Sequence, residues 1–463
     1  MRNSLNPVNQ QIINQMVKRF LSKAKWLLLL AGIASLLTGF SNNKEKRPNV
    51  ILIMADDMGR ECLSSYGSLS YQTHVLDSLA ANGIRFTNCM SQPLCTPSRV
   101  QLMTGLYNYQ NYDYWGNLRN EEYTFDHLMK DAGYATCIAG KWQLNGAHNK
   151  DEIPDWDNRR KPFSFGFDEF CLWQVSERKE EGDRYAKPLI VQNGEYLDTS
   201  GDDYGPDIFS DYILDFIGRK KNQPFFVYYP MVLVHSPFVP TPDSKAWSDP
   251  SRRFEKDTTY FKDMVVYVDK LVGRLTQRLK ELELDQNTVI LFTGDNGTDW
   301  SVYTRTKDGI IRGGKGLTTT AGTHVPLIAY WPDKIRKGKV YSKLVDFTDF
   351  IPTLADLADA GPPSGLHGLS FYPLLTGNPD FEGRITATCH FDQYPLRKGK
   401  EYKRARFVRT VNYKLYHDGR FYNTEKDILE KSPLNKDQLP GPEKDTLKLL
   451  ELAMRKHPMW VEK

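Results

Sequence analysis

The chain has 463 residues, of which 40% are hydrophobic, 12% aromatic and 25% charged. This is the composition of an ordinary globular protein, and it excludes disordered, fibrous and polytopic membrane proteins. The 61 basic residues outnumber the 57 acidic ones, and the resulting formal charge of +4 points by itself to an anionic partner.

The first 41 residues are predicted to be a cleaved secretory signal peptide. They carry five basic residues and no acidic one, and residues 26–37 form an apolar run. A run of about a dozen residues is short of the roughly 20 that a spanning helix needs, so a stable membrane anchor is not expected. Small residues at Gly39 and Ser41 favour cleavage after Ser41. We therefore expect a secreted or periplasmic protein. It would keep 56 basic and 57 acidic residues, a formal charge of −1, so the apparent basicity belongs to the leader.

Four apolar runs have the pattern of buried strands, and a polar segment follows each of them. The runs are residues 50–55, 135–139, 225–229 and 289–292. Such runs are typical of a mostly parallel sheet covered by helices, and residues 75–82 and 261–282 have helical patterns. The polar groups that follow the runs are Asp56 with Asp57, Lys141, His235, and Asp295 with Asn296. A single pair would be explained as a turn. Four strand ends of this kind favour an active site, because reactive groups collect at the carboxyl ends of strands in α/β sheets.

Six cysteines are too few and too scattered for a disulfide framework, and none has the spacing of zinc ligands. They are Cys62, Cys89, Cys95, Cys137, Cys171 and Cys389. Five are interpreted as buried small hydrophobic residues or as members of one or two incidental bridges.

Cys95 opens the strongest local signal, the sequence C-T-P-S-R at residues 95–99. Thr96 is expected to be the N-cap of a short helix, Pro97 its first residue and Gly105 its end, so that Cys95 precedes the helix. A match to C-x-P-S-R in a chain of this length arises by chance about once in a thousand. At this motif the chain resembles the type I sulfatases of the alkaline phosphatase superfamily. In that family the cysteine is oxidised to Cα-formylglycine, whose hydrate is the nucleophile.

The resemblance extends from Pro48 to about Leu434. The matching segments are D-D-x-G at 56–59, G-K-W at 140–142, H-x-P at 235–237, D-N-G at 295–297, K-G at 315–316 and V-P with W-P at 325–332. It implies an α/β fold of the alkaline phosphatase type. This fold has a large mixed, mostly parallel sheet flanked by helices and a smaller C-terminal antiparallel sheet with a helix. We expect a catalytic domain at residues 42–375 and a C-terminal subdomain at 376–463.

The resemblance also implies a cofactor and partners. The metal ligands would be Asp56, Asp57, Cys95 as formylglycine, Asp295 and Asn296. Hard oxygen donors suit Ca²⁺, or alternatively Mg²⁺, and argue against zinc. A formylglycine-generating or sulfatase-maturating enzyme would convert Cys95. No nucleic-acid motif is present, so nucleic acid is not an expected partner.

A sulfate ester is a charged, sluggish electrophile, so its site must neutralise oxygens, align a nucleophile and protonate the leaving alcohol. Arg99, Lys141 and Lys315 supply positive charge, and His235 is the candidate general acid with support from Lys315. The residues expected to bind substrate are Lys141, Gln143, His235 and Lys315. The formylglycine diol would form a covalent sulfate ester and then expel sulfate when its second hydroxyl loses a proton.

Gln143 departs from the family pattern, which reads G-K-W-H. That histidine is a candidate acceptor for the second hydroxyl's proton, whereas glutamine cannot act as a base near neutral pH. His148 or a metal-bound water is a candidate replacement. His324 likewise stands where the family often has arginine.

The substrate is expected to be a sulfated small molecule or glycan, most simply a carbohydrate. The aromatic segment 106–116 is interpreted as core packing, with a sugar-stacking platform as the alternative. Arg305, Lys307 and Arg312 either form a solvated face or guide a polyanionic glycan. Residues 176–187 have mixed charge and are predicted to be a surface loop. Two other functions stay open, a phosphodiester or phosphonate monoester hydrolase and a catalytically dead glycan-binding relative.

Overall fold

The computed structural model describes residues 6–38, 46–176, 184–335, 338–378, 381–393 and 404–458. The chain divides into two units, Met1–Lys46 and Arg47–Lys463. The first unit contains helix α1 (Pro7–Thr38), which includes the predicted apolar run of the leader. The predicted cleavage site after Ser41 lies outside the described residues. No helix among the described residues combines the length and the apolar composition that crossing a membrane requires.

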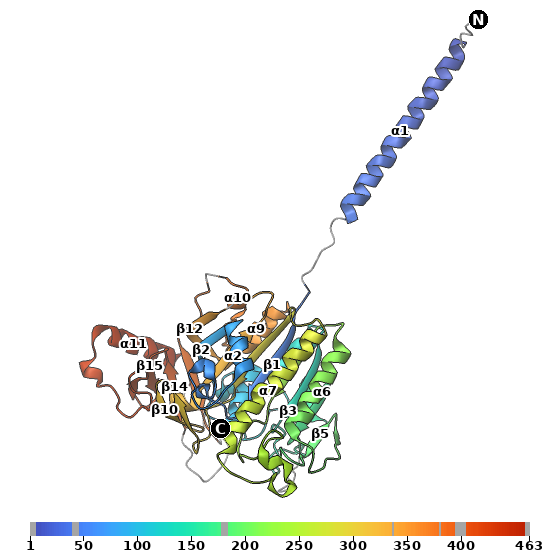
Figure 1. Cartoon of the computed structure of the whole chain (residues 1–463). Helices are drawn as coiled ribbons and strands as arrows, with labels where there is room; N and C mark the ends of the chain where they lie inside the picture. The colour runs from blue at the N-terminus through green and yellow to red at the C-terminus, as the bar shows by residue number, and fades with distance from the viewer. Residues whose placement is uncertain are drawn as a thin grey trace. The chain divides into compact units, whose positions relative to one another are not determined.

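A ten-stranded mixed sheet is the centre of the second unit (Figure 1). In spatial order its strands are β12 (Lys339–Asp346), β2 (Ile84–Met90), β11 (His324–Tyr330), β8 (Thr288–Gly294), β1 (Asn49–Ala55), β7 (Phe225–Pro230), β3 (Ala135–Lys141), β4 (Glu169–Trp173), β5 (Ile190–Gln192) and β6 (Glu195–Tyr196). The five neighbours from β8 to β4 are mutually parallel, and β11 is antiparallel to both β8 and β2. The four predicted strands are therefore confirmed, and their carboxyl ends share one edge.

Helices cover both faces of this sheet. One face packs against α2 (His74–Ala81), α6 (Gly205–Lys220) and α7 (Tyr260–Glu281), and the other against α3 (Cys95–Thr104), α5 (Phe125–Asp131) and α9 (Phe350–Leu357). Within β1, Leu52 belongs to one core and Ile53 to the other. This alternation explains why the strand sequence is apolar at every position. The helices predicted at 75–82 and 261–282 are confirmed as α2 and α7.

A four-stranded antiparallel sheet and a final helix follow in the chain. They comprise β13 (Ala387–Phe391), β14 (Ala405–Arg409), β15 (Tyr413–Tyr416), β16 (Phe421–Asn423) and α11 (Gly441–Arg455). The remaining elements are α4 (Asn108–Asn111), α8 (Thr320–Thr323), α10 (Tyr372–Leu375), the hairpin β9 (Tyr303–Thr306) with β10 (Gly309–Arg312), and 3₁₀ turns η1 (Arg60–Cys62), η2 (Ser64–Tyr66), η3 (Lys161–Phe165), η4 (Lys245–Ser248), η5 (Pro250–Arg252), η6 (Phe347–Asp349) and η7 (Lys436–Gln438). The predicted fold class is confirmed, whereas the boundary at residue 375 stays a prediction.

Helix α3 begins two residues earlier in its motif than predicted. Leu94 is the N-cap, since Ser98 N donates to Leu94 O at 3.2 Å, and Cys95 is the first helical residue. The prediction that Thr96 caps the helix is therefore wrong. Pro97 is tolerated because an N–H in the first helical turn has no intrahelical acceptor. Gly105 ends the helix with φ 68°, as predicted.

Candidate active site

Five strand ends place the predicted site residues together at the carboxyl edge of the large sheet. Asp56 and Asp57 follow β1, Asp295 and Asn296 follow β8, Lys141 ends β3, His235 follows β7, and Cys95 comes five residues after the end of β2. Ligand atoms of Asp56, Cys95 and Asp295 all lie within 4.8 Å of one another. The same holds for Asp56, Asp57 and His235. The sequence therefore predicted which residues converge.

Each buried carboxylate in this cluster is paired with a basic side chain. Lys141 Nζ donates to both oxygens of Asp56 at 2.9 and 2.8 Å, and Arg99 Nη2 donates to Asp295 Oδ2 at 3.0 Å. Lys315 Nζ donates to Asp57 Oδ2 at 2.5 Å. Burial opposes ionisation of Asp56, but the surrounding basic groups, led by Lys141, together outweigh it and hold the pKa of Asp56 well below its usual range. Charges that are this deeply buried persist only when they are paired.

The oxygen donors fit a hard divalent cation. Asp56, Asp57, Asp295 and Asn296 are fully buried, and Asn296 Oδ1 has no hydrogen-bond partner among the described residues. Burial, and next the charge of Asp56, raise the pKa of Asp295 to about 7. A bound cation would give Asn296 Oδ1 a partner and would offset the repulsion between the carboxylates of Asp56 and Asp295. An all-oxygen donor set favours Ca²⁺ or Mg²⁺.

Cys95 is 2% exposed, and its sulfur lies beside this donor set at the start of α3. Burial raises the pKa of the Cys95 thiol above its ordinary value. A protonated thiol is a weak nucleophile, so the unmodified side chain is poorly suited to attack an ester. The other five cysteines are buried and free, which confirms their interpretation as small hydrophobic residues and excludes bridges among them.

His235 and Lys315 form a contacting pair at the mouth of the cluster. Their side chains are 19% and 17% exposed, more than those of the carboxylates and of Lys141 beneath them. Lys315 Nζ lies 2.9 Å from His235 Nε2, and His235 Nδ1 lies 2.6 Å from Ser236 O. Burial lowers the pKa of His235 to about 3. The geometry therefore describes a neutral imidazole that donates from Nδ1 and accepts a hydrogen bond from Lys315 at Nε2.

Gln143 reaches Cys95, and His148 and His324 contact Gln174 and Thr87. The Cys95 thiol points to Gln143 Oε1 at 3.9 Å. His148 Nε2 lies 3.4 Å from Gln174 Nε2, so it lies next to the end of β4. His324 is buried at the start of β11, with Nε2 2.6 Å from Thr87 O.

Arg184 is a site residue that the sequence reasoning missed. Its Nη1 lies 3.7 Å from Asp56 Oδ2, and its guanidinium lies 4.0 Å above the centre of the Trp173 ring. Arg184, Tyr185 and Ala186 are all buried, so the prediction of a surface loop is wrong at this end. Residues 177–183 lie outside the described residues. No local signal in the sequence distinguishes Arg184, because the segment around it has mixed charge.

The aromatic segment is explained mainly by packing. Tyr107 and Tyr112 are 2% and 3% exposed, and Tyr112 OH donates to Gln393 O at 2.9 Å. Trp115 packs against the cluster that contains Leu94 and Phe391. The packing interpretation is confirmed for these three rings.

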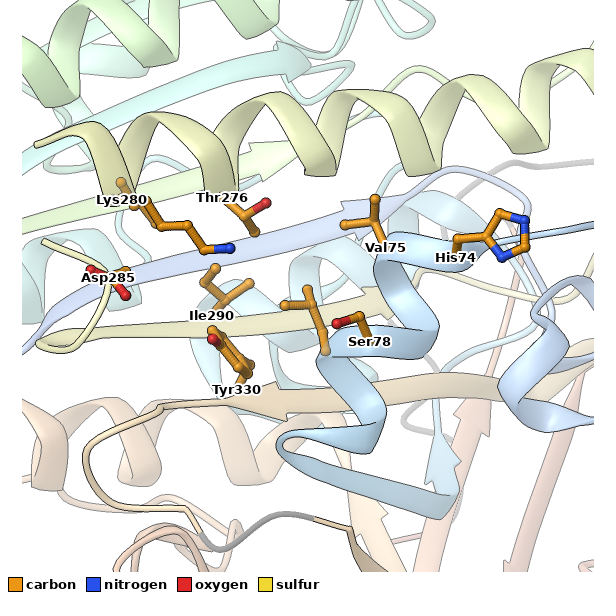
Figure 2. Close-up of a pocket in the computed structure, with 10 residues that line it drawn as sticks. His74, Val75, Ser78, Thr276, Lys280, Asp285, Ile290 and Tyr330 are labelled. Carbon is orange, nitrogen blue, oxygen red and sulfur yellow. The ribbon is translucent and has the colours of Figure 1, made fainter. Parts of the chain in front are cut away.

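A separate cavity of about 260 Å³ lies between α2 and α7 (Figure 2). Val75, Thr276 and Ile290 contribute to its wall, and Lys280 and Asp285 lie at one end. None of its lining residues belongs to the carboxylate and cation cluster. This cavity is therefore separate from the cluster at the sheet edge.

The fold and the site together define an α/β protein whose sheet edge brings buried oxygen donors that suit a metal next to a cysteine at a helix start. Residues 48–360 match the Sulfatase family, and residues 315–440 match the C-terminal region of N-sulphoglucosamine sulphohydrolase. The chain belongs to the sulfatase family.

Three relatives illustrate the range of similarity. The chain is 30% identical to N-acetylgalactosamine-6-sulfatase of Canis lupus familiaris over 71% of this chain and 66% of that protein. It is 27% identical to N-acetylglucosamine-6-O-sulfatase of Bacteroides thetaiotaomicron over 87% of this chain and 84% of that protein. The crystal structure of Ps i-CgsB in complex with k-i-k-neocarrahexaose is 26% identical, with a TM-score of 0.69 over 89% of this chain and 92% of that one.

Proposed function

We propose that this protein hydrolyses sulfate esters of sulfated carbohydrates with a nucleophile derived from Cys95. The observation that carries the proposal is the convergence of Cys95, the four oxygen donors and the cations Arg99, Lys141 and Lys315 at one edge of the sheet. The relatives named for 6-sulfated amino sugars support a sulfated glycan as substrate.

The oxygen donors Asp56, Asp57, Asp295 and Asn296 would hold Ca²⁺, which supplies positive charge to the sulfate and to the nucleophile. Conversion of Cys95 to Cα-formylglycine by a maturation enzyme supplies the oxygen nucleophile that the buried thiol lacks. The fixed charges of Lys141 and Arg99 then hold the sulfate group for attack, because they are in place before the substrate binds.

The Lys315–His235 pair supplies the proton for the leaving alcohol. His235 Nε2 accepts from Lys315 in the free protein, so the mobile proton rests on lysine and reaches the substrate from Nζ or through the imidazole. This agrees with the expectation that His235 is the general acid with support from Lys315, and adds where the proton rests. Without a general acid, the rate of hydrolysis depends more steeply on the pKa of the leaving alcohol. His235→Gln and Lys315→Met should therefore both lose most activity on sulfates of poor leaving groups and less on aryl sulfates.

Mass spectrometry and kinetics test the proposal together. The peptide that contains Cys95, from protein expressed with a maturation enzyme, should carry formylglycine. Aryl sulfate, sulfated amino sugars and aryl phosphodiesters should then be compared with wild type and Cys95→Ala. An unmodified thiol, or equal rates in the two proteins, would overturn the proposed nucleophile. Faster turnover of phosphodiesters than of sulfates would favour the phosphohydrolase alternative.

We propose that the protein acts outside the cytoplasm after removal of its leader. The charge asymmetry and the short apolar run of residues 26–37 support this location. N-terminal sequencing of the exported protein should find Asn42 as the first residue. Retention of the first 41 residues in a cytoplasmic fraction would contradict it.

A further inference from the structure

The β9–β10 hairpin presents an aromatic and cationic face to solvent. We define the hairpin face as Trp300, Tyr303, Arg305, Ile310 and Arg312. Trp300, Tyr303 and Ile310 are 61%, 60% and 71% exposed, whereas Thr304 and Thr306 between them are buried. The alternation of a strand pair therefore turns its large side chains outward, and Tyr303 pairs with Arg312 across the hairpin.

The hairpin face is also preorganised. The Arg312 guanidinium lies 5.4 Å from the ring centres of both Trp300 and Tyr303, and Arg312 Nε donates to Trp300 O at 2.9 Å. Arg305 accepts at its carbonyl from Leu69 N at 2.8 Å, which fastens the hairpin to the body of the unit. Residues 303–312 carry three basic residues and one acidic residue. A rigid, exposed aromatic pair with net positive charge is suited to bind a ligand that has both flat apolar faces and negative charge.

The chain connects this face directly to the active site. Trp300 comes four residues after Asn296, and Arg312 comes three residues before Lys315. Because an extended residue spans at most about 3.6 Å, Arg312 Cα lies within about 11 Å of Lys315 Cα. Both ends of the hairpin are also fixed, since Lys315 N donates to Thr298 O and Gly313 N to Val302 O, each at 2.9 Å.

From these contacts we infer that the hairpin face is a subsite for the neighbouring units of a sulfated or uronate-containing glycan whose scissile sulfate lies at Cys95. The rings stack on sugar faces, and Arg312 and Arg305 pair with sulfate or carboxylate groups. The inference rests on the proposed function and specifies an oligomeric anionic glycan as the substrate. A partner protein is the other occupant that such a surface suits, but charge and continuity with the site favour the glycan.

Steady-state kinetics test the subsite with Trp300→Ala and Arg312→Ala. One probe is 4-nitrophenyl sulfate. The other is a hexasaccharide of chondroitin 6-sulfate, heparin or carrageenan, whichever the wild type turns over fastest. The ratio of kcat/KM for the hexasaccharide to that for 4-nitrophenyl sulfate should fall about tenfold in each variant, mainly through KM. Arg159→Ala is the matched control, since Arg159 lies 5.1 Å from the Tyr196 ring on a different exposed stack. Its ratio should equal that of wild type. An unchanged ratio in both hairpin variants would overturn the inference.

Binding and association measurements separate the remaining outcomes. Calorimetry in the Cys95→Ala background should show that Trp300→Ala weakens hexasaccharide binding about tenfold. If binding depends on the hairpin but no probe is hydrolysed, the proposed function is contradicted and the subsite is supported. Sulfatase activity with hairpin-independent binding would sink the subsite alone. A shift from dimer to monomer in Trp300→Ala, with an unchanged kinetic ratio, would assign the face to a second copy of the chain and overturn the inference.

Discussion

Gln143 Oε1 lies 3.9 Å from the sulfur of Cys95, at the position where the resembled family carries histidine. The Gln143 backbone has φ 53°, in the left-handed region, and histidine is among the residues that tolerate this region. The position therefore accepts either side chain, and only the imidazole can remove a proton from the nucleophile position.

Gln143→His should raise kcat about tenfold near neutral pH, because a positioned base accelerates a proton transfer. Burst and steady-state kinetics on 4-nitrophenyl sulfate measure the effect on the release step. Gln143→Asn is the matched control, since it shortens the amide without adding a base. An unchanged kcat in Gln143→His would show that another group already takes the proton.

Arg184→Met should lower kcat/KM about tenfold or more. Arg184 is a buried cation 3.7 Å from Asp56 Oδ2, and its loss leaves the carboxylates less well balanced. Arg184→Lys should recover part of the activity. Arg253→Met is the control, because Arg253 stacks at 5.0 Å on Trp247 and its described ion pair is with Asp202, which is not part of the site. Equal losses in the two methionine variants would point to general destabilisation.

Asn296→Ala should weaken metal binding and reduce the rise in Tm that Ca²⁺ produces. The reason is that Asn296 Oδ1 is a buried acceptor without a partner among the described residues, and a ligand that binds more tightly stabilises the folded state more. Calorimetric titration with Ca²⁺ and thermal melts with and without EDTA measure both effects. Tm values that do not respond to Ca²⁺ or EDTA in wild type would contradict a metal site.

Lys414→Met should destabilise the protein by about 3–5 kcal/mol, because it leaves Glu430 as an unpaired buried charge. Lys414 is fully buried, and its Nζ donates to Glu430 Oε1 at 2.7 Å and to Thr318 O at 2.5 Å. Denaturant melts measure the change. The double variant with Glu430→Leu should recover much of the loss, and an additive further loss would contradict the pairing argument.

The same contacts have a kinetic consequence. Thr318 comes three residues after Lys315, and Tyr416 OH also contacts Thr318 Oγ1 at 3.1 Å. The C-terminal sheet therefore holds the loop that carries Lys315. Lys414→Met should lower kcat at temperatures where the variant is still folded.

Asp126→Asn should stabilise the protein at pH 7 by at least about 1 kcal/mol and have little effect at pH 3. Burial raises the pKa of Asp126 well above its ordinary value. The unfolded carboxyl ionises near pH 4 while the folded one stays protonated, so folding is penalised increasingly as pH rises above 4. Asparagine is neutral throughout. Urea melts at the two pH values test this, with the exposed Asp157→Asn as control.

The sequence alone was sufficient to predict the large sheet and most of its site. The strand of residues 50–55 is apolar on both faces and ends at Asp56, and such a strand has one stable place, between two helical layers. Parallel strands bring their carboxyl ends to one edge, so Lys141 and His235 were predicted to meet Asp56 although each lies far from it in the chain.

Other parts of the site depend on the tertiary structure. Arg184 lies in an irregular segment of mixed charge, and no periodicity distinguishes an arginine that turns inward from one that remains in solvent. The start of α3 at Cys95 depends on Leu94 as the cap, which local preference assigned to Thr96.

The sequence determined which chemical groups the site contains, because its cysteine, oxygen donors and several of its basic residues stand at strand ends and at a helix start. Only the tertiary structure decided how those groups are paired: that Lys315 rests between Asp57 and His235, that the C-terminal sheet holds its loop, and that Trp300 and Arg312 stand exposed nearby. Pairings of this kind arise from close packing between segments that are distant in the chain, so the local sequence pattern does not predict them.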